Sequence, residues 1–294
     1  FSLFIRTFRW RRMVRTVGEV GYWTVFHSQN VGYLMNNTLP MRAGELLRAV
    51  AVARKGDMSI TSVLSTVVVE RILDFFGLAF TFGLAVAFFP LPDWLQGGGA
   101  LLSAVVVVLL AVLIVMSRHV ERAESVVSRL TSPRGKLVKR IGAVLINLTK
   151  GLAVFQSIGQ IVYLLLMTIA LWIIYIATMQ LVMAAFPFTG SMPGPHTWWL
   201  PGAVLTVMTT LGLAIPSAPG AVGTYHAAAL AGLAMYDIEG GVAVVCATFV
   251  HAMMIAVLNL FGVIGLFGLR LSPRDLLKQS KAVEEKPLQE KVKA

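Results

Sequence analysis

The chain has 294 residues, of which 57% are hydrophobic and only 13% are charged. Soluble globular domains average about 25% charged residues, so this composition excludes an ordinary soluble domain and indicates a polytopic membrane protein. The single cysteine, Cys246, lies in an apolar stretch, which excludes a disulfide framework and a cysteine-based zinc site.

Four uninterrupted apolar stretches are long enough to cross a hydrocarbon core of about 30 Å. They are residues 59–89, 100–116, 158–186 and 241–269. Each predicts a membrane-spanning helix, and the fold class expected from them is all-α.

The net charge of +11 is distributed unevenly, because 23 of the 25 basic residues fall in four clusters. These clusters are residues 6–15, 42–55, 118–140 and 270–293. Three other connections contain no Lys or Arg: residues 90–99, 187–196 and 236–240. By the positive-inside rule the four clusters are cytoplasmic and the three connections face outward. Membrane topology therefore explains the basic charge, and we expect no nucleic-acid partner.

Two further apolar stretches begin and end on the same predicted side of the membrane. Residues 18–41 lie between two basic clusters, and residues 197–235 lie between two outward connections. Each is predicted to be a re-entrant hairpin. The first carries the polar residues 27–30 near the middle of two short arms. The second breaks at "IPSAPGAVG", residues 215–223, where prolines remove donors and glycines permit sharp turns.

Together these segments predict an inverted repeat with two re-entrant helical hairpins entering from opposite sides. Each hairpin precedes a long span, 59–89 or 241–269, and inverted repeats with broken helices are a common transporter plan. By symmetry a span precedes the first hairpin, with residues 1–5 as its last turn, so we expect the N-terminal span to be truncated. Residues 1–271 are predicted to be a membrane transport domain and residues 272–294 a disordered cytoplasmic tail.

Charged residues inside the apolar stretch 59–89 are the first candidate site. Glu70, Arg71 and Asp74 lie there, and charge inside a membrane is costly enough to suggest a function. In one interpretation Arg71 pairs with a carboxylate and holds helices together. In the other, Arg71 binds a lipid phosphate and a carboxylate binds a cationic group or a proton.

The stretch "NNTLPMRAGELLR" supplies six more candidates: Asn36, Asn37, Pro40, Arg42, Glu45 and Arg48. On a helix beginning near Met41, the last three share one face. Arginine geometry suits phosphate, and a helix N-terminus adds donors. The alternative is that Arg42 and Arg48 anchor the helix at the cytoplasmic surface, with Glu45 as their partner.

The break of the second hairpin supplies the remaining candidates: Ser217, Gly220, Gly223, Tyr225 and His226. A proton-relay role for His226 and His251 stays open beside ordinary hydrogen-bonded packing. The sequence contains no P-loop, zinc-protease or Rossmann motif. Residues Asp237 and Glu239 weakly resemble a metal–sugar-nucleotide motif. We predict no catalytic residue, no metal site and no cofactor.

Three motifs carry a family resemblance: "NNTLPMRAGELLRA", "VVVERILD" and "IPSAPGAVGTYHAAAL". Over nearly its whole length the chain resembles the flippase-like membrane family that includes the transmembrane domain of lysylphosphatidylglycerol synthase. This resemblance implies movement of a lipid between leaflets, often an aminoacylated phospholipid or a lipid-linked glycan carrier. Some archaeal relatives are described as glycosyltransferases. Many members carry a glutamate at the position of His226, and if that glutamate binds a cationic headgroup, its replacement argues against an aminoacyl-lipid substrate.

The leading hypothesis is a lipid flippase, not an enzyme, in a prokaryotic inner membrane with the C-terminal tail in the cytoplasm. Its expected partner is a membrane lipid, with a homo-oligomer or a lipid-modifying enzyme as further partners to consider. One alternative is a membrane glycosyltransferase that uses a lipid-linked sugar and a metal held by Asp237 and Glu239. The other is an ion or small-solute transporter on a similar plan.

Overall fold

The computed structural model describes residues 1–39, 43–88, 97–101, 103–108, 111, 157–186, 198–215 and 218–270. Within these residues the protein is all-helical, as predicted, and contains no strand. Three predicted site residues, Pro40, Arg42 and Ser217, lie outside the described residues. So do most of the predicted span 100–116 and the predicted tail.

Three helices are long and apolar enough to cross a membrane: α4 (Ile60–Phe88), α8 (Ile158–Ala185) and α11 (Gly240–Leu269). They confirm three of the four predicted spans to within a few residues. The shorter described elements are α1 (Ser2–Val14), α2 (Tyr22–Thr38), α3 (Gly44–Lys55), α9 (Leu200–Ala214), η3 (Pro219–Ala221) and α10 (Thr224–Ala234).

The prediction of a two-armed hairpin within residues 18–41 is wrong. Helix α2 is continuous through the polar residues 27–30, and two of these side chains bond within their own helix. The Asn30 amide donates to the Phe26 carbonyl at 2.7 Å, and the Gln29 amide donates to the Tyr33 hydroxyl at 2.8 Å. The helix ends at Leu39, which is extended (φ −107°, ψ 147°), as expected for a residue before proline. The returning arm is α3, which packs against α2.

The second helical pair breaks where the sequence predicts. Helix α9 ends at Ala214 and α10 begins at Thr224, with the short η3 turn between them. Gly220 and Gly223 adopt positive φ angles of 68° and 96° there, which other residues adopt at a steric cost. Helices α9 and α10 then pack against each other.

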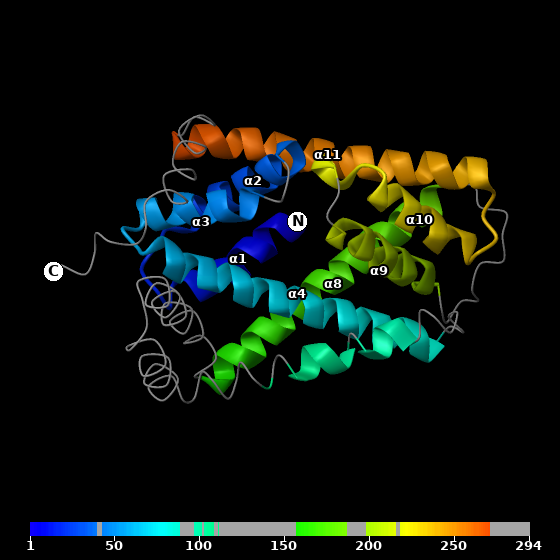
Figure 1. Ribbon diagram of the computed structural model, residues 1–294, viewed down its shortest axis with the longest axis horizontal. Helices are drawn as coiled ribbons and strands as arrows, with labels where there is room; N and C mark the ends of the chain where they lie inside the picture. Colours follow the sequence, from blue (N-terminus) through cyan, green and yellow to red (C-terminus); the bar gives the residue numbers. More distant parts are fainter. Residues whose placement is uncertain are drawn as a thin grey trace, which may run out of the picture.

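The two helical pairs pack reciprocally, each against the long helix of the other half of the chain. Helix α2 lies along α11 and α9 lies along α4, while α1 contacts α8 (Figure 1). Helices α2 and α11 approach each other closely at Gly262, which has no side chain. A Cβ added there would lie only 2.4 Å from Leu34 Cβ. The end of α2 also contacts η3, where a Cβ added at Gly220 would lie 3.7 Å from the Asn37 carbonyl oxygen. The tips of the two pairs therefore meet.

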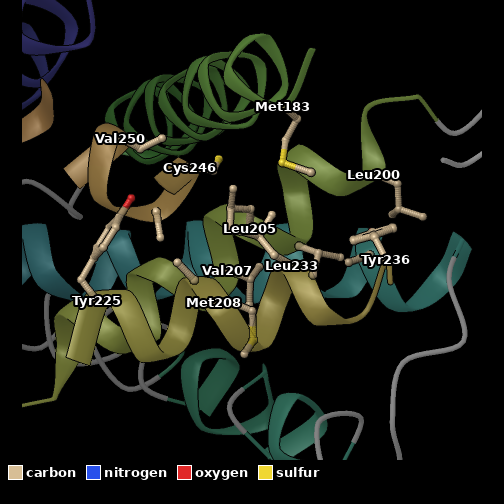
Figure 2. Close-up of a cluster of buried hydrophobic side chains, with 14 of the residues drawn as sticks. Met183, Leu200, Leu205, Val207, Met208, Tyr225, Leu233, Tyr236, Cys246 and Val250 are labelled. Carbon is tan, nitrogen blue, oxygen red and sulfur yellow. The ribbon is translucent and has the colours of Figure 1, made fainter. Parts of the chain in front are cut away.

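Apolar side chains hold this arrangement. A small cluster that includes Val31, Leu34 and Leu269 joins α2 and α3 to α11, and two bigger clusters lie elsewhere. The larger of these two joins α4, α8, α9, α10 and α11, and Figure 2 shows part of it, including Met183, Leu205 and Leu233. The other joins α1, α3 and the first halves of α4 and α8, around the fully buried Trp10. The cluster around Trp10 brings α1 and α3 against the turn of α4 that carries charge.

Candidate functional site

The charged turn of α4 lies against α1 and α3, and both helices supply arginines to it. Arg6 and Arg9 come from α1, and Arg48 comes from α3. Glu45 joins them from the first turn of α3. With Glu70, Arg71 and Asp74 of α4, these seven residues form what we call the charge cluster.

The inner part of the charge cluster is sealed from solvent. Glu70 has a fully buried side chain, and its Oε2 lies 2.8 Å from Nη2 of Arg48. Its Oε1 lies 3.5 Å from Nη2 of Arg9, which is also fully buried. The Arg48 guanidinium lies 4.5 Å from the centre of the Trp10 ring, and the Trp10 indole N–H donates to Thr66 at 3.0 Å. Packing and ion pairing together therefore fix Arg48.

The outer part of the charge cluster centres on Asp74. This carboxylate accepts hydrogen bonds from Arg6 at 2.9 Å, from Arg71 at 3.2 Å and from Arg9. Arg71 also contacts Glu45, with 2.7 Å between its Nη2 and Oε1. The Arg71 and Glu45 side chains are 31% and 23% exposed. The outer edge is thus accessible while the inner part is not.

The charge cluster is not electrically balanced within the described residues. Four guanidinium groups (Arg6, Arg9, Arg48 and Arg71) face three carboxylates (Glu45, Glu70 and Asp74), which leaves one excess positive charge. In addition, Nε and Nη1 of the buried Arg48 have no hydrogen-bond partner. Uncompensated charge and unpaired donors are costly away from water, so this excess is an unusual feature of the protein.

Five predicted site residues belong to the charge cluster: Glu45, Arg48, Glu70, Arg71 and Asp74. Arg71 does pair with carboxylates, those of Glu45 and Asp74, while its binding of a lipid phosphate stays a prediction. The interpretation of Arg48 as a surface anchor partnered by Glu45 is wrong. Arg48 is buried against Glu70, and Glu45 pairs with Arg71 instead. The partners of Arg48 and Glu45 lie on another helix, α4. The spacing of residues within α3 therefore could not reveal them.

Sequence reasoning missed Arg6 and Arg9, which it assigned to a cytoplasmic cluster. Residues 2–5 form the first turn of α1, and that helix continues through both arginines to Val14. The sequence did contain a signal for these two residues. Arg6 and Arg9 are three residues apart, so they lie on the same side of a helix, and that helix also carries the buried Leu3 and Trp10. Thr168 of α8 also belongs to the site, since it accepts a hydrogen bond from Arg9 at 2.9 Å.

The end of α2 contacts the α3 side of the site and the second helical pair. Asn36 lies beside the start of α3, because a Cβ added at Gly44 would lie 2.7 Å from its Oδ1. The Asn37 amide donates to Asn259 of α11 at 2.9 Å. Both predicted asparagines therefore lie where the tips of the helical pairs meet.

The predicted residues of the second pair gather around its break. Tyr225 stacks on His251 with ring centroids 4.2 Å apart, and the His226 ring is 4.8 Å from the His251 ring. Nε2 of His251 lies 2.8 Å from the Gly220 carbonyl oxygen, so this nitrogen carries the proton and donates it. The Gly223 N–H donates to Nδ1 of His226 at 3.4 Å. Hydrogen-bonded packing of His251 is confirmed, while a proton relay stays a prediction.

Asp237 and Glu239 are both exposed, in the connection between α10 and α11. In the described part of the chain, no group of three or more His, Cys, Asp and Glu side chains could hold a metal ion.

Three helices able to cross a membrane make this an integral, multi-pass membrane protein. The family model described as the lysylphosphatidylglycerol synthase TM region matches residues 1–284. The chain belongs to this family, which is linked to lipid handling, and the resemblance seen in the sequence is confirmed. Searches for similar curated proteins and for similar solved structures returned no match.

Proposed function

We propose that the protein moves a phosphate-bearing lipid, either a phospholipid or a lipid-linked glycan, between membrane leaflets and catalyses no covalent reaction. The observation that carries this proposal is the charge cluster, which lies on the spanning helix α4 and has a partly exposed edge. Ionisable groups inside a membrane are costly and usually mark a substrate or ion pathway. Membership of a lipid-handling family supports a lipid as the substrate.

The outer arginines are suited to bind the phosphate. Arg71 and Arg6 present guanidinium groups at the accessible edge, held by Asp74 and Glu45. Guanidinium binds phosphate oxygens through two parallel hydrogen bonds, so a phosphate can take the place of a carboxylate. The sealed contacts of Glu70 with Arg9 and Arg48 hold the edge in position during this exchange.

The order and packing of the helices support a transporter plan. A helix, a pair of short helices and a long helix follow one another twice: α1, α2–α3 and α4, then α8, α9–α10 and α11. Reciprocal packing of α2 on α11 and of α9 on α4 is expected of an inverted repeat. In our proposal the two pairs are re-entrant and enter a prokaryotic inner membrane from opposite sides. The acyl chains stay in lipid while the headgroup passes the meeting tips.

Leaflet exchange of fluorescent phospholipids in proteoliposomes tests this proposal. We expect the wild-type protein to accelerate exchange and Arg71→Ala and Arg6→Ala, which each remove a guanidinium from the accessible edge, to abolish most of it. Arg15→Ala is the matched control, because it removes an ion pair with Glu19 that is exposed and lies outside the charge cluster. A folded wild-type protein that exchanges no lipid would overturn the proposal. Exchange unaffected by the two cluster variants would remove the charge cluster from the path.

The alternatives give different results in the same vesicles. A glycosyltransferase would consume a lipid-linked sugar in the presence of a divalent metal and would lose this activity when Asp237 and Glu239 are replaced. An ion or solute transporter would carry flux without lipid exchange. Either result, obtained without lipid exchange, would replace the proposed function.

A further inference from the structure

The excess positive charge of the charge cluster indicates which headgroup the site accepts. With four guanidinium groups and three carboxylates, the described cluster is neutralised by a ligand of charge −1. A zwitterionic headgroup leaves the excess in place, and a cationic headgroup enlarges it. Net charge is costly where water is scarce, so the neutral complex is the most stable of the three.

No carboxylate of the charge cluster is free to bind an ammonium group. Glu45 contacts Arg71, and Asp74 contacts three arginines. Glu70 contacts Arg48 and Arg9 and is fully buried. A headgroup with a cationic centre would have to displace a guanidinium from one of these carboxylates, whereas a phosphate meets guanidinium groups directly.

The second helical pair offers no acidic partner either. Helices α9 and α10 contain no Asp or Glu between their first and last residues, and the residues gathered at their break are Tyr225, His226 and His251. At the accessible edge of the first pair, the Arg71 guanidinium adds donor capacity but not acceptor capacity. The described tips of both pairs are therefore better suited to an anion than to a cation.

We infer that the transported lipid carries one net negative charge, in a phosphodiester headgroup without an ammonium group, and that the Arg71–Glu45 pair selects for this charge. This inference rests on the proposed function and adds the substrate class to it. The phosphodiester accepts hydrogen bonds from Arg71 and displaces Glu45. The negative charge of the ligand then takes the place of the Glu45 carboxylate beside Arg71.

A pair of variants with opposite charge changes separates selection by charge from simple structural support. Arg71→Gln and Glu45→Gln each disrupt the same 2.7 Å ion pair and place the same neutral side chain at one of its two positions. The first lowers the net charge of the cluster from +1 to 0, and the second raises it to +2. A structural role predicts equal effects, while selection by charge predicts opposite ones.

The measurement is the ratio of initial exchange rates of fluorescent phosphatidylglycerol and phosphatidylcholine in the same proteoliposomes. We expect the wild-type ratio to favour phosphatidylglycerol by roughly tenfold, because phosphatidylcholine brings an ammonium group to a cluster that already has an excess positive charge. Arg71→Gln should reduce the ratio to near one. Glu45→Gln should preserve or raise it, and Arg71→Lys, which keeps the charge, should retain most of it.

The outcomes separate this inference from the proposed function. Equal exchange of both lipids by the wild-type protein, or an equal fall of the ratio in both Gln variants, would overturn the inference and leave lipid transport standing. No exchange of either lipid would overturn the proposed function. In that case binding still tests charge selection: dihexanoyl phosphatidylglycerol should raise the melting temperature of the detergent-solubilised protein more than dihexanoyl phosphatidylcholine does, and equal shifts would overturn the inference.

Discussion

The two halves of the molecule share an order of helices but are held together differently. In the first half, ion pairs join α1, α3 and α4 around Glu70 and Asp74. In the second half, helices α8, α9, α10 and α11 contain no Asp, Glu, Lys or Arg between their bounds. Apolar packing joins them instead (Figure 2). A helical pair and its long helix therefore pack without charge in the second half, so such packing does not itself require the charge of the first half.

Polar contacts between helices occur in both halves. In the first half, Trp10 donates to Thr66 on another helix, and Arg9 donates to Thr168 on a third. In the second half, the Gly202 N–H donates to Gln180 of α8 at 3.0 Å, and His251 of α11 donates to the Gly220 carbonyl at 2.8 Å. The two halves therefore differ in their ion pairs and not in whether polar groups bond between helices.

The largest expected effect comes from breaking the sealed part of the charge cluster. Glu70→Ala leaves the buried Arg48 without its carboxylate and removes one of the two carboxylates that contact Arg9, and we expect a loss of about 3–5 kcal/mol in the free energy of unfolding. Thermal unfolding in detergent measures this loss. Arg15→Ala, which removes an exposed ion pair, should cost no more than about 1 kcal/mol. Equal costs for the two variants would show that burial of the cluster does not matter.

A smaller effect is expected at the glycines that let each helical pair close. A Cβ added at Gly44 would lie 1.9 Å from the Gly32 carbonyl oxygen, and one added at Gly212 would lie 2.7 Å from the Thr224 carbonyl oxygen. Gly44→Ala should therefore destabilise the protein by about 1–3 kcal/mol, and Gly212→Ala by less. Gly83, whose added Cβ would meet nothing within 4 Å, provides the control. The melting temperatures of the three variants rank these costs, and a cost for Gly83→Ala as large as that for Gly44→Ala would argue against close packing.

The sequence predicted those parts of the fold that depend on apolar length and on prolines and glycines. Three spanning helices and the break around Gly220 followed from these local signals. The position of the first break did not, because α2 continues through its polar residues 27–30, of which Gln29 and Asn30 bond within the helix. Polarity near the middle of an apolar stretch is therefore a weaker signal of a break than a proline is.

The candidate site was predicted in part, for a physical reason. Glu70, Arg71 and Asp74 stand out because charge is costly in an apolar helix, and that reasoning works on one segment at a time. Arg9 was missed because its segment is rich in arginine, so its own charge did not stand out. Which arginine meets Glu70 depends on how α1 and α3 pack against α4, and this is a tertiary property that no single segment contains.

The smallest expected effect concerns the contact between the halves at the tips. Asn37 of α2 donates to Asn259 of α11 at 2.9 Å, next to the Gly220 break. Hydrogen bonds between membrane helices contribute about 0.6 kcal/mol on average, so a double-mutant cycle with Asn37→Ala and Asn259→Ala should give a coupling near that value. If the tips separate when a headgroup passes, each single variant should also accelerate lipid exchange, because the closed arrangement loses a contact that the open one lacks. Normal stability with slower exchange would mean instead that the asparagines contact the headgroup, and the tips would then belong to the binding site together with the charge cluster.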